Sequence, residues 1–169
     1  MRILVEHSEI VEMCEKIGKE LSEKFVGKNP LVVCVLKGAC PFHSELIKHM
    51  DIDLEVDYIQ VSSYKGTKST GNVQIKRDFD QSIEDRHVIL VEDIVDTGVT
   101  LNALKPMLQA RHPLSVTVVS MLDKPSKRKV EFVPDYVGKT IDDLFVIGFG
   151  LDLDEKYRNL KDIYVYNED

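Results

Sequence analysis

The chain has 169 residues, of which 43% are hydrophobic and 30% charged, so it is too apolar for a disordered protein and can bury a core without disulfide or metal support. Its formal net charge of -7 argues against nucleic acid or an anionic membrane as a partner, and any phosphate must be recognised locally. The three cysteines, Cys14, Cys34 and Cys40, lack zinc-type spacing and are expected to be reduced, mostly buried thiols of a cytoplasmic protein.

The first third of the chain predicts a helix, a buried strand and a second helix. Apolar residues at helical spacing predict a helix over residues 8–25, with Ser8 as its N-cap. Residues 31–36 are apolar and largely β-branched, which indicates a strand covered on both faces, and residues 41–50 can form the next helix. No apolar run approaches the roughly 20 residues of a membrane span, and acids interrupt the first apolar stretch before it can form a secretory signal.

The rest of the chain alternates in the same way. Residues 53–62 mix β-branched and polar side chains as a strand does, and residues 62–72, rich in Ser, Thr, Gly and Lys, are expected to form a mobile loop. A helix is expected over residues 100–109, with Pro106 as an irregularity. Three further apolar runs are expected to be strands, at residues 87–92, 116–122 and 144–149.

Strands that alternate with helices predict one α/β domain over residues 1–169, with a largely parallel central sheet flanked by helices. Ligands of such sheets bind beyond the carboxyl ends of the strands. The site is therefore expected at the turns after Leu36, Glu92, Leu122 and Phe149.

The turn after the strand at residues 87–92 carries the most specific chemistry. Two adjacent carboxylates, Glu92 and Asp93, end a buried strand, where they are costly unless they hold a cation or a polyhydroxylated ligand. Thr97, Gly98 and Thr100 then offer hydroxyls and backbone N–H groups where a helix begins, which suits a phosphate. An isolated Asp-Thr-Gly would more often be a helix cap with exposed acids before it.

The whole segment 91–100, Val-Glu-Asp-Ile-Val-Asp-Thr-Gly-Val-Thr, resembles the signature of the type I phosphoribosyltransferases, which bind 5-phosphoribosyl-1-pyrophosphate. That resemblance implies the type I fold with a small hood bearing the base-binding strand. It implies that Glu92 and Asp93 face the ribose hydroxyls and help place Mg²⁺, and that Asp96 is the general base. The 5′-phosphate would be wrapped by Asp96, Thr97, Gly98, Val99 and Thr100.

Two other stretches narrow the resemblance to the hypoxanthine-guanine phosphoribosyltransferases. Leu36-Lys37-Gly38-Ala39 looks like their pyrophosphate loop, which implies pyrophosphate contacts from Lys37 and Gly38 and a cis peptide between Leu36 and Lys37. Ser63-Tyr64, followed by Ser69-Thr70-Gly71, is similar to their lid loop, although composition alone would equally suit a plain polar surface loop.

The last third supplies the implied purine contacts. Lys124 matches the lysine that donates to the purine 6-oxygen, and Phe145 matches the aromatic that stacks on the base, while the Val146 backbone reads the ring edge and Ile94 also lines the purine. Asp152 would hold a second Mg²⁺ near pyrophosphate, which Arg158 would bind. Without the resemblance, Phe145 would be a core residue, and the Lys-Arg-Lys run at 127–129 is expected to be solvated surface charge.

The implied activity is purine salvage, in which the 5-phosphoribosyl group passes to N9 of hypoxanthine or guanine with Mg²⁺ as cofactor, giving IMP or GMP in a homodimer or homotetramer. Lys124 and the 145–146 segment favour a 6-oxopurine over orotate or uracil without separating hypoxanthine, guanine and xanthine. A regulatory sensor that binds nucleic acid is the alternative from another class, and the net charge of -7 and the single-domain length speak against it.

Overall fold

The computed structural model describes residues 1–63 and 72–167, and it contains a six-stranded central sheet with the strand order β4-β3-β2-β5-β6-β7. Every neighbouring pair is parallel except β3 and β4, which pair antiparallel at one edge. The predicted largely parallel α/β sheet is therefore confirmed. The strands are β2 (Leu31–Leu36), β3 (Glu55–Ser63), β4 (Val73–Arg77), β5 (His87–Val95), β6 (Ser115–Asp123) and β7 (Tyr136–Thr140).

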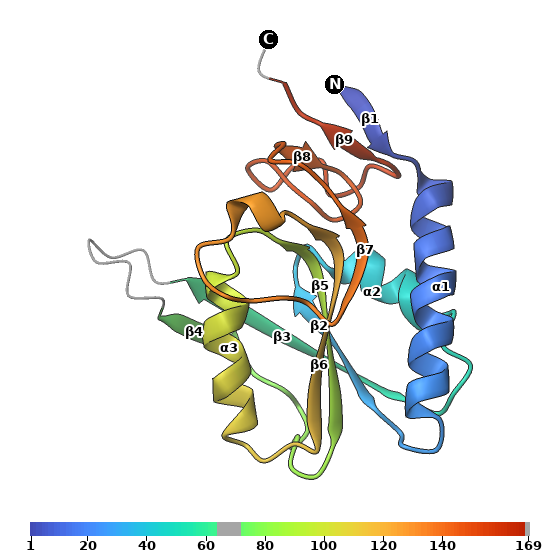
Figure 1. Ribbon diagram of the computed structural model, residues 1–169, viewed down its shortest axis with the longest axis vertical. Helices are drawn as coiled ribbons and strands as arrows, with labels where there is room; N and C mark the ends of the chain where they lie inside the picture. The colour runs from blue at the N-terminus through green and yellow to red at the C-terminus, as the bar shows by residue number, and fades with distance from the viewer. Residues whose placement is uncertain (64–71, 168–169) are drawn as a thin grey trace.

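Helices cover both faces of this sheet (Figure 1). Helices α1 (His7–Phe25) and α2 (Cys40–Ile47) pack on one face, and α3 (Val99–Gln109) packs on the other. Alternate side chains of β2 enter the two cores, since Val32 lies with α1 and α2 while Leu31 and Val33 lie with α3. Leu31–Leu36 thus is a strand buried on both sides, as its composition predicts.

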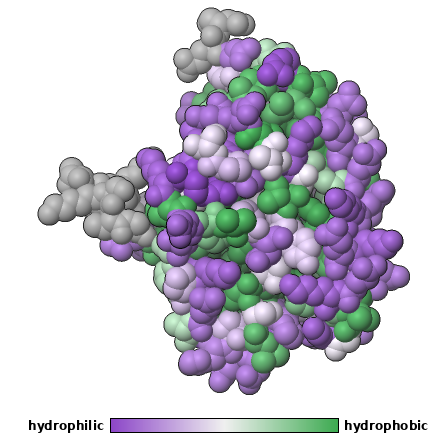
Figure 2. Space-filling view, in the orientation of Figure 1, coloured by the Kyte–Doolittle hydropathy of each residue, from purple (hydrophilic) through white to green (hydrophobic). Residues whose placement is uncertain are grey.

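Helix α1 buries one apolar stripe and exposes its charged face, and hydrophilic residues predominate along it at the right edge of Figure 2. The prediction of Ser8 as its N-cap is wrong, because the helix begins at His7 and Glu6 is the capping residue. The Glu6 N–H donates to the Glu9 carboxylate at 3.4 Å, so an acid three residues later completes the cap. No helix in the described ranges combines the length and hydrophobicity that a membrane crossing requires.

A second, three-stranded antiparallel sheet forms a hood over the carboxyl ends of the central strands (Figure 1). Its order is β1-β9-β8, with β1 at Arg2–Val5, β9 at Ile163–Val165 and β8 at Val146–Ile147. The strand expected at residues 144–149 is therefore only two residues long and belongs to the hood. Gly148, Phe149 and Gly150 have φ of 97°, 49° and 98°, which turns the chain directly after Ile147.

The bounds of other helices and strands also differ from those predicted from the sequence. Helix α2 ends at Ile47 rather than Met50. Strand β5 continues to Val95, so Asp93 lies inside a strand that was expected to end at Glu92. The expected loop at residues 62–72 falls largely outside the described residues. Cys14 and Cys34 are buried, and burial raises the pKa of the Cys14 thiol to about 12. Cys40 is exposed, because it begins α2 at the turn after β2. The thiols are therefore mostly buried, as expected.

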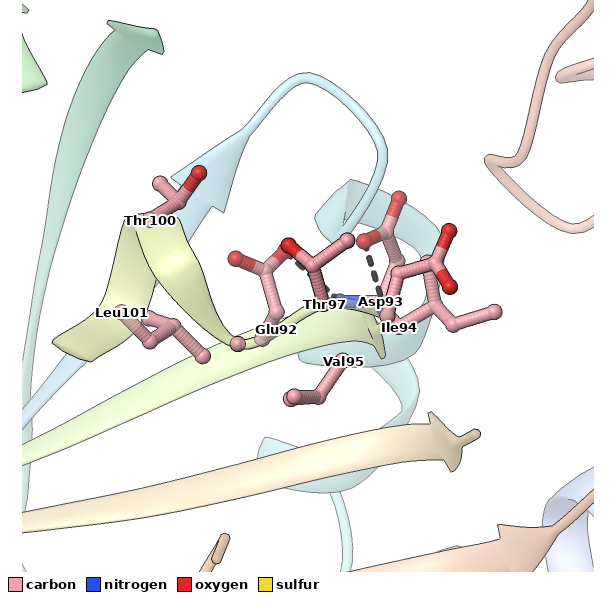
Figure 3. A pocket seen from close by; sticks show the side chains of 9 residues that line it. Glu92, Asp93, Ile94, Val95, Thr97, Thr100 and Leu101 are labelled. Carbon is pink, nitrogen blue, oxygen red and sulfur yellow. Dashed lines mark hydrogen bonds between the residues drawn. The ribbon is translucent and has the colours of Figure 1, made fainter. Parts of the chain in front are cut away.

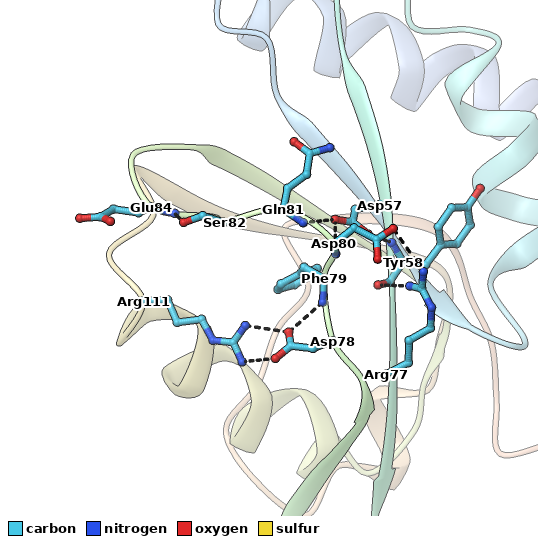
Figure 4. A network of polar contacts seen from close by, with 10 residues as sticks. All are labelled: Asp57, Tyr58, Arg77, Asp78, Phe79, Asp80, Gln81, Ser82, Glu84 and Arg111. Carbon is cyan, nitrogen blue, oxygen red and sulfur yellow. Dashed lines mark hydrogen bonds and ion pairs between the residues drawn. The ribbon is translucent and has the colours of Figure 1, made fainter.

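One buried carboxylate fixes the turn that leads from β4 to β5 (Figure 4). Asp57 on β3 is 2% exposed and accepts hydrogen bonds from the backbone N–H groups of Tyr58, Asp80 and Gln81, at 2.7, 3.0 and 3.2 Å. Three N–H donors compensate the desolvation of a buried charge. This network therefore sets where β5, the strand of the site, enters the sheet.

Candidate functional site

The end of β5 and the start of α3 enclose a cavity of about 160 Å³ (Figure 3). Gly98 is the N-cap of α3 and has φ of 80°, and a Cβ at this position would lie 2.8 Å from Cδ of Arg128. Only glycine fits that conformation and that spacing. The cavity is lined by Glu92, Asp93, Ile94, Val95, Asp96, Thr97, Gly98, Thr100 and Leu101, which include most of the residues expected around ribose phosphate.

Two neighbouring acids dominate the electrostatics of this cavity. The Asp93 N–H donates to the Glu92 carboxylate at 2.9 Å, and the Ile94 N–H donates to the Asp93 carboxylate at 2.6 Å. Burial raises the pKa of both carboxyls, and the charge of Asp93 raises that of Glu92 further, whereas the nearby Arg158 pulls the pKa of Asp93 down. A cation beside these acids would offset their mutual repulsion.

A second cavity, of about 330 Å³, adjoins the first and shares Asp93, Ile94 and Asp96 with it. Lys124 follows β6 and is only 5% exposed. Phe145 directly precedes the hood strand β8 and is 51% exposed. Among the described residues, the Lys124 ammonium has neither an ion pair nor a hydrogen bond. The lining comprises Asp93, Ile94, Asp96, Lys124, Lys127, Asp143, Phe145, Val146, Leu151 and Asp152.

Asp96 stands at the boundary between the two cavities. Its Oδ1 is buried and has no hydrogen-bond partner in the described part of the chain, and its Oδ2 lies 4.0 Å from Nζ of Lys127. A buried carboxylate oxygen without a donor is costly, and such an atom is available to a ligand or a proton. This position fits the expected base.

The expected pyrophosphate residues converge at the other side of Asp93. The Leu36–Lys37 peptide is cis, which confirms that prediction. A Cβ on Gly38 would overlap the Asp93 carboxylate, and a Cβ on Gly150 would overlap the Gly38 carbonyl oxygen. Glycines therefore let the β2–α2 turn pass between the acids of β5 and the loop that leads to Arg158.

Arg158 is held by its own loop. It donates to the Gly150 carbonyl oxygen at 2.7 Å and contacts Asp152 at 3.4 Å and Glu155 at 3.1 Å, while its Nε is buried without a partner among the described residues. Lys37 contacts the same Glu155 at 3.0 Å. These two cations lower the pKa of Glu155, Lys37 being the larger cause.

Residues 2–155 match the family model described as the phosphoribosyl transferase domain. A hypoxanthine-guanine phosphoribosyltransferase of Streptococcus pneumoniae is 48% identical over 169 residues, which cover 99% of this chain and 94% of that protein. The chain belongs to the hypoxanthine-guanine phosphoribosyltransferase family.

Solved structures of phosphoribosyltransferases agree with this fold. A hypoxanthine phosphoribosyltransferase from Staphylococcus aureus superimposes with a TM-score of 0.95 at 43% identity, covering 99% of this chain and 91% of that one. The Trypanosoma cruzi enzyme in complex with the product IMP superimposes with a TM-score of 0.92 at 41% identity, over 98% of this chain and 93% of that one. The expected type I phosphoribosyltransferase fold is therefore confirmed.

The site of this phosphoribosyltransferase also contains residues that the sequence did not single out. Arg128, expected to be solvated, has a side chain that is only 13% exposed and bonds the Asp123 carboxylate at 2.6 Å and the Asp96 carbonyl oxygen at 2.9 Å. Lys127 contacts Asp143 at 3.2 Å inside the second cavity, and its pKa is raised first by that contact. The expectation of solvated surface charge is thus wrong for Arg128, because a 3₁₀ turn at Pro125–Lys127 directs the chain back over the site. Lys127 is exposed, as expected, although it also lines the second cavity.

The expected lid is described only at its first residue. Ser63 ends β3, and its hydroxyl lies 3.1 Å from that of Thr100. Tyr64 and Ser69-Thr70-Gly71 lie outside the described residues. Ser63 therefore stands beside the first turn of α3, where the phosphate is expected.

Proposed function

We propose that this phosphoribosyltransferase moves the 5-phosphoribosyl group of 5-phosphoribosyl-1-pyrophosphate to N9 of hypoxanthine or guanine. The products are IMP or GMP and pyrophosphate, and the reaction serves purine salvage in the cytoplasm. One observation carries the proposal: a cavity at a helix N-terminus and a cavity with a buried lysine adjoin at Asp96. The S. pneumoniae relative, 48% identical, carries the name of this activity.

The second cavity suits a 6-oxopurine. Lys124 brings an ammonium that only donates hydrogen bonds, so it favours a 6-oxygen and disfavours the 6-amino group of adenine. Phe145 presents an exposed ring for stacking, and Val146 follows it with backbone groups at the edge of the cavity. The base is therefore held between the hood and the end of β6.

The first cavity suits the sugar phosphate. The N–H groups at Thr97, Gly98, Val99 and Thr100 open α3 and favour an anion, as the helix dipole also does. Glu92 and Asp93 accept hydrogen bonds from ribose hydroxyls. Lys37, the Gly38 backbone and Arg158 then bind the pyrophosphate beyond Asp93.

The donor set fits magnesium, which we include as the cofactor. No group of three or more metal-ligating side chains converges within the described residues. Mg²⁺ commonly keeps water and binds through one or two carboxylates together with substrate phosphates. The paired acids Glu92 and Asp93, whose pKa values are raised, would hold one ion, and Asp152 would hold a second. Bound there, the ions would supply positive charge to the leaving pyrophosphate.

The chemistry breaks the C1′–oxygen bond to pyrophosphate and forms the C1′–N9 bond. The purine loses a proton on glycosylation, and Asp96 accepts it at N7 through Oδ1, the oxygen that has no partner among the described residues. Lys37 and Arg158 stabilise the negative charge that develops on the leaving group. Lys124 orients the base by its 6-oxygen.

The experiment offers each of hypoxanthine, guanine, xanthine and adenine to the protein with magnesium and 5-phosphoribosyl-1-pyrophosphate, and identifies the nucleotide by chromatography. We expect IMP and GMP and little AMP. Asp96→Asn keeps the shape and removes the base, so turnover should fall about 10²- to 10⁴-fold. Undiminished turnover in this variant would refute the role of Asp96, and nucleotide formed only from orotate or uracil would refute the proposal.

Self-assembly into a homodimer or homotetramer is part of the proposal. A T. cruzi hypoxanthine phosphoribosyltransferase, 38% identical, has been solved to study how its C-terminal region affects oligomeric state and activity. Light scattering after size exclusion should give a mass of two or four chains. A monomer with full activity would contradict this part alone.

A further inference from the structure

The turn that carries Glu155 has an unusual backbone. Leu153 and Lys156 exchange two backbone hydrogen bonds, at 3.1 and 3.0 Å, and thereby close a two-residue turn. The two central residues, Asp154 and Glu155, have φ of 51° and 66°. Both angles are left-handed, as in a type I′ turn, where glycine and asparagine are the usual residues.

Glutamate is a poor choice for that backbone, because a left-handed conformation crowds its Cβ. The Glu155 N–H donates to the Asp152 carboxylate at 2.9 Å, which helps to hold the residue in this position. Residues kept in sparsely populated backbone regions cluster at functional sites, where the surrounding structure enforces them. The side chain of Glu155 is therefore expected to have a function.

That side chain bridges the two cations that we assign to pyrophosphate. Oε2 lies 3.0 Å from Nζ of Lys37, and Oε1 lies 3.1 Å from Nη2 of Arg158. Lys37 follows β2, whereas Arg158 lies 121 residues further along the chain, so a single carboxylate joins two separate parts of the site. Each of its oxygens contacts one cation, as two oxygens of a pyrophosphate would.

We propose that Glu155 is an internal competitor of pyrophosphate, whose carboxylate holds Lys37 and Arg158 and must release them before the substrate or the product binds there. Glu155 is a positioning residue, because it acts through the two cations. It limits the affinity for pyrophosphate and so favours release of the product. This inference rests on the proposed function of Lys37 and Arg158.

The size of the effect follows from the exposure of the pairs. The Lys37 and Glu155 side chains are 57% and 64% exposed, and pairs of this kind are weak because water screens them. Breaking both pairs should cost a factor of about two to ten in pyrophosphate affinity. Removing the carboxylate should therefore tighten pyrophosphate binding by that factor.

The test titrates inorganic pyrophosphate with magnesium into the wild-type protein, Glu155→Gln and Asp154→Asn, by calorimetry. Asp154→Asn is the matched control, since it removes one charge from the same turn without touching either cation. We expect Glu155→Gln to bind pyrophosphate two- to tenfold more tightly, with a matching fall in KM for 5-phosphoribosyl-1-pyrophosphate. Asp154→Asn should stay within twofold of the wild type.

Each result has a distinct meaning. Damage to the turn would weaken binding, so tighter binding in Glu155→Gln alone can only come from loss of the competing carboxylate. Equal or weaker binding in Glu155→Gln overturns the inference, and weaker binding would mean that Glu155 organises the two cations for the ligand. If the wild-type protein neither binds pyrophosphate nor forms nucleotide, the proposed function itself fails.

Discussion

Arg128 makes the clearest quantitative prediction, because its guanidinium joins three parts of the site. It pairs with the Asp123 carboxylate at 2.6 Å and donates to the carbonyl oxygens of Phe132 and Asp96 at 2.8 and 2.9 Å. The Arg128 and Asp123 side chains are 13% and 8% exposed, so the pair is buried. Arg128→Ala leaves the Asp123 carboxylate buried without its partner.

Loss of one partner of a buried ion pair costs about 3–5 kcal/mol. Water can replace part of the two lost contacts to carbonyl oxygens, so these contacts do not raise the cost above that range. We therefore expect Arg128→Ala to lose about 4 kcal/mol of unfolding free energy, of a total that is typically about 5–15 kcal/mol. Arg128→Lys keeps the charge but not the planar fork, so it should recover only part of this loss. The Asp96 loop loosens in both variants, and turnover falls with it.

Urea unfolding followed by circular dichroism measures the free energy directly. Lys129→Ala is the matched control, because Lys129 is exposed and contacts the Thr97 carbonyl oxygen only through its backbone N–H. That control should stay within about 0.5 kcal/mol of the wild type. A loss below about 1 kcal/mol in Arg128→Ala would refute the view that this guanidinium holds the loop.

Three further outcomes test other parts of the site. Lys124→Ala should lower the preference for hypoxanthine over adenine about 10- to 100-fold, because a hydrogen bond from a charged group is lost. Competition kinetics with both bases measures this preference. An unchanged preference would mean that Lys124 does not bind the 6-oxygen. Gly98→Ala places a Cβ on a left-handed residue, at a cost of about 1–2 kcal/mol, and directs it towards Arg128. The KM for 5-phosphoribosyl-1-pyrophosphate should therefore rise at least about tenfold. Initial-rate measurements that give an unchanged KM would show that Gly98 does not help to bind the phosphate. Burial raises the pKa of Glu92 in the folded protein above its ordinary value of 4.5, so the wild type loses stability as the pH rises above 4.5. Glu92→Gln should therefore be the more stable protein at pH 8 in the presence of a chelator, and the difference should vanish below pH 4.5. Urea unfolding that gives the same difference at every pH would contradict this.

The central sheet could be predicted from the sequence because its strands are buried on both faces and are therefore continuous apolar runs. Leu31–Leu36 matches its predicted bounds, and β5 and β6 extend the predicted strands by only a few residues. Most of the hood could not be predicted in this way. Strand β8 lies within the apolar run at residues 144–149, but β1 and β9 have only four and three residues and pair across about 160 positions of sequence, as Arg2 does with Val165, so no local pattern indicates those two strands.

The same distinction applies to the site. Residues in a contiguous motif, such as Thr97 and Gly98, could be assigned from local order alone, and the cavity confirms that they lie together. Arg128 and Glu155 could not be assigned from local order. A guanidinium in a charged run is typical of solvated surface, and its burial depends on the fold. The left-handed backbone at Glu155 likewise has no signal in the sequence. Pro125, which lies two residues before the Lys-Arg-Lys run, is the signal in the sequence that the chain turns there.

The hood makes recognition of the base depend on strand β9, which lies far from β5 and α3 in the sequence. Strand β8, next to Phe145, pairs in its sheet with β9 at Ile163–Val165, whereas the residues around the ribose phosphate are complete by Leu101. A domain generally folds as a unit. The hold on the purine therefore depends on pairing between β8 and β9, whereas the cavity for the ribose phosphate is lined by the contiguous segment 92–101.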